Sequence, residues 1–419
     1  MKKFTQTAVA IGMAAASSLS AQSLFDLAPD DGETESLPLS YTAGVTFGYD
    51  GNPTPALSSD DEALYAQAYI GASFLANGPQ TTTNFGAQVG VIHYFDNLDA
   101  PGVEVDDTTG TASLYLNWTH RTSERLRFVS QNFAAYELEP DYSTGYQAQR
   151  QTGNYLRWSS NNAVGYRWSE RTGTYSGVKL DGISFDDVVN GDRTTVTLFS
   201  DFRYQLSERT VATLSYRHAD TSASGNVSDA TNQFILGGLE HRFNQRSTGV
   251  LRVGAQIRDV ENGRSSNSPY VEGSFRTAIN SQLSLRSYVR YGVEDFQRNV
   301  AAPPVIVVIG NNVFLQSRSA VYANTDTLRL GLTADYSVSQ DLVLSGGINY
   351  AALNYNDLQV GNLANSIDDE FLNVFVGLSL RVTDNVSVNA RYNLEDLTSD
   401  VDARGYDRNR FSIGASTRF

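Results

Sequence analysis

The chain has 419 residues, a formal net charge of -15, 23 Tyr, 34 Gly and no cysteine. The negative balance excludes a nucleic-acid-binding surface, which needs a basic face, and the absence of cysteine fits an oxidising destination without disulfides. No run of about 18 apolar residues follows the first 21 residues, so no spanning helix is predicted.

Residues 1–21 have the composition of a secretory signal peptide. Lys2 and Lys3 precede an apolar run from Ala8 to Ala16, and small residues follow up to Ala21. A positive start, an apolar centre and a small-residue end are the parts of such a leader. Cleavage after Ser20 and cleavage after Ala21 both fit. Residues 22–39 are then expected to form an acidic periplasmic segment, and residues 40–419 the folded domain.

From Tyr41 onward, an alternating strand, a tight polar turn, a second alternating strand and a longer loop repeat along the chain. The tight turns begin with residues such as Ser123, Ser207 and Asn280, whose side chains can bond the local backbone at a bend. This repeat predicts an all-β protein, a transmembrane antiparallel up-and-down β-barrel of about 18 strands within a range of about 16 to 20. Short periplasmic turns and long outer loops are expected.

Alternation within the predicted strands separates two faces. In residues 386–395 every even position is apolar, from Val386 to Leu394, and every odd position is polar. A membrane barrel needs such alternation because one face meets lipid and the other a wet lumen. A soluble sandwich also alternates, but it would not repeat the same turn chemistry around the entire chain.

The last ten residues alternate in the same way and end in Phe419. This length suffices for a tilted spanning strand, which needs about 9 to 11 residues. The tail resembles the C-terminal signal of bacterial outer-membrane barrels. Three of the tight turns read Ser-Glu-Arg, at residues 123–125, 169–171 and 207–209. These turns, with Tyr- and Arg-rich strands, resemble the putative β-barrel porins of Gram-negative bacteria. That resemblance implies recognition of the last strand by the barrel assembly machinery. The residues that match the signal are Phe411, Ile413, Ala415, Thr417 and Phe419, with Thr417 the poorest match.

Arginine supplies almost all positive charge of the mature chain, because Lys occurs only at positions 2, 3 and 179. Two interpretations of the inward-pointing arginines stay open. They set an anion preference or bind acidic sugars, or they pair with inner Asp201, Glu294, Asp335 and Glu395 and stiffen the wall. The candidates for lumen selectivity are Arg203, Arg217, Arg252, Arg286, Arg290, Arg329, Arg381 and Arg391. Arg127, Arg157, Arg258 and Arg276 are also predicted to point inward.

No catalytic, cofactor or metal site is predicted, and we expect the chain not to be an enzyme. The histidines lie on separate predicted strands without a partner motif, and no phosphate loop, dinucleotide fingerprint or zinc spacing occurs. The expected place of the histidines is the lumen or the membrane interface. They are His93, His120, His218 and His241.

Two kinds of outer loop stand out. Acidic clusters such as Asp60-Asp61-Glu62, Asp106-Asp107, Asp186-Asp187 and Asp368-Asp369-Glu370 form either a solvated rim or sites for cations that bridge lipopolysaccharide. The loop 296–325 holds Pro303-Pro304 followed by an apolar run to Ile309. It can fold into the lumen as a constriction, extend as an outer hairpin, or lie against a partner chain.

Together these features predict an outer-membrane, porin-like channel for passive diffusion of small hydrophilic solutes. The alternative is an outer-membrane barrel for export or anchoring of surface polysaccharide, and an outer-membrane hydrolase ranks third. The expected partners are outer-membrane lipid and lipopolysaccharide, the barrel assembly machinery and, as one option, two further copies in a homo-trimer. No nucleic acid is expected.

Overall fold

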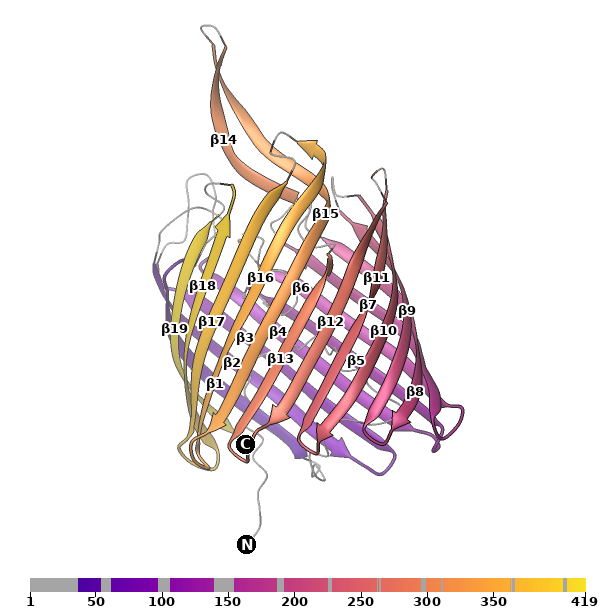
Figure 1. Ribbon diagram of the computed structural model, residues 1–419. Coiled ribbons are helices and arrows are strands. Elements are labelled where there is room, and N and C mark those ends of the chain that lie inside the picture. Colours follow the sequence, from indigo (N-terminus) through magenta and orange to yellow (C-terminus); the bar gives the residue numbers. More distant parts are fainter. Residues whose placement is uncertain are drawn as a thin grey trace.

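A computed structural model gives the fold (Figure 1). The structure describes residues 37–53, 62–96, 106–138, 154–186, 192–224, 228–261, 263, 265–294, 299–309, 312–361, 363, 366–401 and 405–419. The predicted leader, most of the predicted acidic segment and the acidic residues Asp60, Asp61 and Asp187 lie outside these ranges. Among the described residues, no helix has the length and apolar composition needed to cross a membrane.

The described chain is all β. Its strands are β1 Leu37–Asp50, β2 Ala63–Asn77, β3 Thr81–Tyr94, β4 Thr108–Arg121, β5 Leu126–Glu137, β6 Tyr155–Arg167, β7 Thr172–Phe185, β8 Arg193–Ser207, β9 Thr210–Ala223, β10 Ala230–Asn244, β11 Ser247–Val260, β12 Ser266–Ala278, β13 Leu283–Val293, β14 Asn299–Ile309, β15 Asn312–Ser337, β16 Leu342–Gly361, β17 Ile367–Arg381, β18 Val386–Ser399 and β19 Tyr406–Arg418.

Each barrel strand pairs antiparallel with its sequence neighbours, and β19 pairs back with β1 from Arg418 opposite Thr42 to Arg410 opposite Asp50. β13 pairs directly with β15, so β14 stands outside the wall. The result is a closed 18-stranded barrel, as predicted. Closure leaves no unpaired edge in the membrane, which is the condition for a sheet to span it.

β14 and the first part of β15 form a hairpin that projects beyond the barrel rim, at the end opposite the short turns (Figure 1). The sequence of residues 296–325 allows three arrangements, and the described backbone takes the outer hairpin. The hairpin turn itself, residues 310–311, lies outside the described residues.

The short turns carry the local bonds that their side chains predict. Ser123 Oγ accepts hydrogen bonds from the backbone N–H groups of Arg125 at 3.2 Å and Leu126 at 3.1 Å. Asn280 Oδ1 accepts equivalent bonds from Gln282 and Leu283, both at 2.8 Å. Both bonds recur at Ser169, Ser339 and Thr383, and the first of them recurs at Ser207 and Asn244. These side chains replace ladder bonds lost at each bend.

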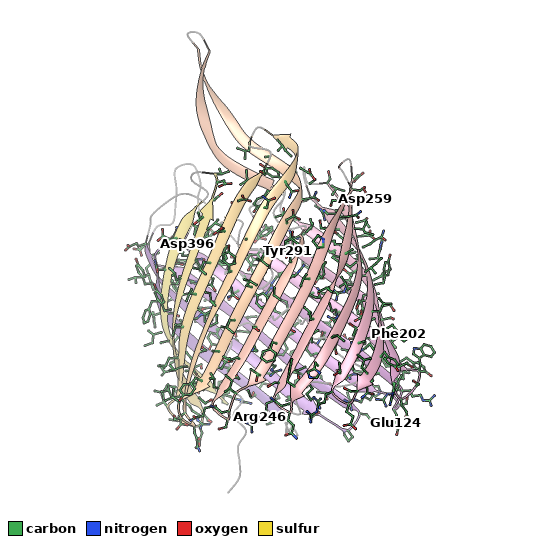
Figure 2. The ribbon with its side chains drawn as sticks, viewed as in Figure 1. Glu124, Phe202, Arg246, Asp259, Tyr291 and Asp396 are labelled. Atoms are coloured by element: carbon green, nitrogen blue, oxygen red, sulfur yellow. The ribbon has the colours of Figure 1, made fainter. Side chains whose placement is uncertain are left out.

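The two faces of the wall differ as the alternation predicts. Outward positions carry exposed apolar side chains, among them Ile70, Leu198 and Leu251, each more than half exposed. Figure 2 shows Phe202 projecting from the outer surface, and Glu124 and Arg246 at the end with the short turns. Inward positions carry the buried charges, among them Arg203, Glu240 and Glu272. An apolar band around a polar interior fits lipid outside and water inside.

Candidate functional site: the charged inner wall

A chain of ion pairs runs along the inner face from β8 to β12. The Arg203 guanidinium contacts the Glu240 carboxylate two strands away, and both side chains are at most 2% exposed. Arg252 bridges the next gap, with 3.2 Å from Nη2 to Glu240 Oε1 and 2.8 Å from Nη1 to Glu272 Oε1. Arg217 binds Glu272 with two bonds of 3.0 and 2.6 Å. Each carboxylate here therefore serves two arginines.

A second group continues this ladder across β13 and β15. Glu294, just beyond the end of β13, accepts bonds from Arg329 Nε at 3.1 Å and Nη2 at 2.8 Å, and Arg290 Nη2 lies 3.6 Å away. Burial alone would raise the pKa of Glu294, but the guanidinium groups of Arg329 and Arg290 lower it below its ordinary value. The register brings these two arginines together, because Arg290 lies opposite Arg329. Their shared carboxylate offsets the repulsion between them.

Other candidate arginines are much more accessible. Arg286 keeps 47% of its side chain exposed while it binds Asp335 at 2.9 Å. Arg381 binds Asp341 of the adjacent short turn and is 41% exposed. Arg391 lies over the Phe375 ring, 4.7 Å from its centroid. The predicted set thus runs from buried members of the ladder, through the partly exposed ladder members Arg217 and Arg290, to members that face open space.

The remaining inner arginines pack in other ways. Arg258 is fully buried and donates to Asn324 Oδ1, Asn232 Oδ1 and the Ala323 carbonyl. Arg157 lies over the Phe133 ring and 3.7 Å from Glu137. Arg127 lies on the inward-facing parity of β5, and Arg276 lies on that of β12 opposite Arg286. Of the predicted inner carboxylates, Asp335 and Glu294 pair with candidate arginines, and Glu395 lies 4.0 Å from Arg408.

One charged cluster was missed in the sequence, at the seam between β1 and β19. Asp50 is fully buried and accepts a 2.9 Å bond from Arg408 Nε, and Arg410 Nε lies 3.0 Å from its other oxygen. The Arg410 guanidinium also lies over the Tyr65 ring. The sequence does contain a signal for this cluster, because Asp50 ends the first strand and two arginines lie near the start of the last strand.

Three apolar clusters of the described residues line the inner wall near the end with the long loops, and two of them include loop residues. Tyr322, Tyr355 and Phe371 belong to the larger one, together with Leu363 and Val401 from the loops that follow β16 and β18. In the smaller cluster, Leu138 at the start of the β5–β6 loop packs against Tyr65 and its neighbours on β2 and β3. These three loop residues therefore lie inside the wall, so residues of the long loops line the inner face at this end.

Three of the four histidines share one arrangement on the outer surface. His93, His120 and His241 each place Nδ1 at 2.7–2.8 Å from the hydroxyl of the threonine opposite on the neighbouring strand. Each also contacts an aromatic ring two positions along its own strand. His218 lies 3.2 Å from Asp220. Within the described residues, no group of three or more His, Asp and Glu could hold a metal ion.

The terminal strand presents its predicted residues to the outside. Phe411, Ile413 and Phe419 are 48%, 50% and 69% exposed, and Ala415 and Thr417 share their face. Phe419 also joins the seam, since its backbone exchanges hydrogen bonds of 2.8 and 3.0 Å with Tyr41, and the two rings stack. The alternating tail is thus the last strand of the barrel wall and closes it against β1.

A closed 18-stranded wall with an apolar outer band and a charged interior is a membrane-spanning structure, and residues 317–419 match the family model described as putative beta-barrel porin 2. The protein is a closed transmembrane β-barrel. Its outer wall contacts lipid. No curated protein matches the chain.

Matches among solved structures include three proteins from pseudomonads. OpdK of Pseudomonas aeruginosa with vanillate is 13% identical, with a TM-score of 0.45 and coverage of 91% of this chain and 99% of OpdK. OccK2 (OpdF) of the same organism in complex with glucuronate is 11% identical, with a TM-score of 0.45 and coverage of 92% of this chain and 97% of OccK2. A BenF-like porin from Pseudomonas fluorescens is 10% identical, with a TM-score of 0.45 and coverage of 92% of this chain and 99% of that porin.

Proposed function

We propose that this barrel is a porin-like channel through which small hydrophilic solutes diffuse passively across the outer membrane. The observation that carries the proposal is the charged inner wall within a closed barrel of 18 strands. Barrels of this size enclose a lumen larger than their side chains can fill. A wall that offers both charge signs lets polar solutes exchange hydration for contacts of similar strength.

Conductance of the purified, refolded barrel in a planar lipid bilayer tests this function. A porin gives steady open conductance without any other protein. A barrel for export or anchoring of surface polysaccharide would be silent without its periplasmic partners, so absence of conductance from folded protein would reject the proposal. Uptake of small sugars and amino acids into proteoliposomes then shows which solutes pass.

Within this channel, we propose different tasks for the accessible and the buried arginines. Arg286, Arg290 and Arg391 keep part of their side chains exposed, so their charge can act on passing ions. Arg203, Arg252 and Arg329 are at most 5% exposed and bind carboxylates, so they brace the wall. Arg217 and Arg381 are also partly exposed, and their ion pairs measure 2.6 and 2.5 Å. These pairs are shorter than those of Arg286 and Arg290, which measure 2.9 and 3.6 Å.

The triple variant Arg286→Gln, Arg290→Gln, Arg391→Gln tests this division. Its reversal potential in a salt gradient should shift toward cations, and the shift should shrink as salt rises, because the Debye length is only about 10 Å at 0.1 M. Arg203→Gln is the control, which should lower thermal stability without changing selectivity. An unchanged reversal potential in a conducting triple variant would show that these three arginines do not set ion selectivity.

The terminal residues Phe411, Ile413, Ala415, Thr417 and Phe419 are proposed to act as the assembly signal, after residues 1–21 have directed export and been removed. Their shared outward face supports this role. Deletion of Phe419 should leave the protein in the periplasm, degraded or aggregated. Normal yield of the deletion in the outer membrane, measured by fractionation, would show that the tail is only a structural strand.

A further inference from the structure

The outer surface carries a closed ring of polar side chains in the middle of β5 and β6. Ser130 Oγ donates to Asn162 Oδ1 at 2.7 Å, and Asn162 Nδ2 donates to Ser160 Oγ at 2.9 Å. Ser160 Oγ donates to Asn132 Oδ1 at 2.7 Å, and Asn132 Nδ2 donates to Ser130 Oγ at 2.9 Å. Ser130 lies opposite Asn162 and Asn132 opposite Ser160, so the ring spans the two strands.

The ring faces outward, as the neighbours in sequence show. Val129, Ala135 and Ala163 are buried on the inner face, and strand residues alternate between faces. The even-numbered ring residues therefore point away from the lumen, and Asn162 is exposed. In Figure 1 these strands belong to the far, fainter wall.

The ring also lies within the apolar band and not at its edge. Leu116 on β4 is opposite Asn132, and Leu180 on β7 is opposite Ser160. Both leucines are exposed outward, at 37% and 40%. Hydrocarbon offers no hydrogen bonds, so polar groups at this depth need protein partners.

The ring does not use all of its own hydrogen-bonding capacity. The second N–H of the Asn162 amide has no partner among the described residues, and each amide oxygen of the ring accepts one hydrogen bond although it has two lone pairs. A patch that holds both a free hydrogen-bond donor and free acceptor sites can bond to an identical patch on a second copy. An isologous contact, in which one patch meets the same patch, has this property.

The shape of the face also suits close approach. The outward positions at its centre are Ser, Asn and Ala134, and no outward side chain of β5 or β6 is charged. Trp118 lies opposite Ser130 and Trp158 opposite Ala134, so two large rings border the small centre. Trp158 lies flat over Gly182, where a Cβ would be 2.0 Å from the ring. Small residues let membrane segments pack closely, and polar groups then bond across the interface.

We propose that the outward face of β5 and β6 is the contact between two copies of this chain in the membrane, with the ring of Ser130, Asn132, Ser160 and Asn162 at its centre. The two barrels would stand side by side about a twofold axis along the membrane normal. The amides would then exchange hydrogen bonds across the axis. This predicts a dimer in place of the trimer considered from the sequence.

The chain has no cysteine, so a single introduced thiol reports the contact directly. Asn162→Cys should form a disulfide-linked dimer when native outer membranes are oxidised. Leu330→Cys is the matched control, because Leu330 is 41% exposed on β15, far from β5 around the wall. Absence of dimer from Asn162→Cys, equal dimer from both variants, or linkage of Asn162→Cys to a different protein would each overturn the proposal.

A second variant tests the chemistry of the contact. Asn132→Leu with Asn162→Leu makes the patch apolar and should abolish most of the dimer seen by native mass spectrometry in mild detergent. Heat-modifiable mobility on gels shows that the monomer remains folded. Ser287→Leu, on the outward parity of β13, is the control and should keep the dimer. A dimer that persists in the double leucine variant would also overturn the proposal.

Discussion

At the scale of single residues, an arginine of this wall is defined by the carboxylates around it. Arg252 touches two glutamates and is almost fully buried, whereas Arg286 touches one aspartate in a solvated place. The same residue type therefore has two energetic roles. A buried carboxylate that serves several arginines is the costliest partner to remove, since its loss leaves buried charges unpaired.

Glu272→Gln should therefore destabilise the barrel strongly. It removes the partner of Arg217 and Arg252, and breaking a buried pair from one side costs about 3 to 5 kcal/mol. Asp335→Asn removes the partner of the exposed Arg286 and should cost about 1 kcal/mol or less. Denaturant unfolding of both variants in lipid vesicles measures the difference. Equal losses would mean that the ladder contributes no more than surface pairs do.

Residue positions in the wall follow from alternation, but their partners do not. The parity of Arg203 predicts an inward side chain, yet its contact with Glu240 lies two strands away and depends on the tilt and register of β8 to β10. Sequence alone could not separate the buried Arg203 from the exposed Arg286 for this reason. The polar ring on β5 and β6 did leave a signal, because Ser130 and Asn132 interrupt the face that is apolar on other strands.

At the scale of elements, period-two alternation and the turn residues account for nearly all strands. Seven turns close with the local bonds expected of Ser, Asn or Thr. The arrangement of residues 296–325 could not be chosen beforehand, because an apolar run after two prolines suits a hairpin, a constriction or an interface equally well. Here the pairing of β14 with β15 decides it.

The two faces of one strand should respond differently to charge. Val89→Arg puts a guanidinium on the lipid side of β3, where Val89 is 53% exposed, and should cost about 2 to 4 kcal/mol if it lies near the bilayer midplane. Gln88→Arg, one position earlier, points inward and should cost little. Refolding yield and unfolding free energy of both variants test the register of β3. Similar destabilisation by both would contradict the assigned faces.

The outer hairpin should be dispensable for the barrel. β14 pairs only with β15, while β15 reaches β13 and β16 through residues from Ala320 onward. Replacement of residues 300–318 by a short Gly-Ser linker should therefore leave heat-modifiable folding and bilayer conductance unchanged. Loss of folding in this variant would mean that the hairpin nucleates or supports the wall.

At the scale of the whole molecule, both ends of the barrel wall lie at the rim with the short turns, where Tyr41 meets Phe419. Membrane barrels of bacteria place short turns in the periplasm and long loops outside. The long loops, the hairpin and the residues that fold inside the wall would then face the exterior. The entrance that solutes meet first would carry the apolar clusters around Tyr322 and Tyr65.

Epitope tags test this orientation on living cells. A tag beside Asp106, which precedes β4 at the end with the long loops, should bind antibody on intact cells. A tag at Glu208, in the short turn between β8 and β9, should need permeabilised cells. The opposite labelling pattern would show that the long loops face the periplasm, contrary to the assigned orientation.

The seam between β1 and β19 has a consequence for the life of the nascent chain. β1 obtains its second neighbour, β19, only when the end of the chain is present, so one edge of β1 stays unpaired until β19 joins it. Loop-closure entropy grows only logarithmically, by about 0.6 kcal/mol for each doubling of length, so joining distant ends is a modest thermodynamic burden. The greater risk is kinetic, because an unpaired sheet edge can pair with strands of other chains until its own partner arrives. A chaperone that shields the strand from Leu37 to Asp50 would therefore matter more to yield than any further stabilisation of the finished wall.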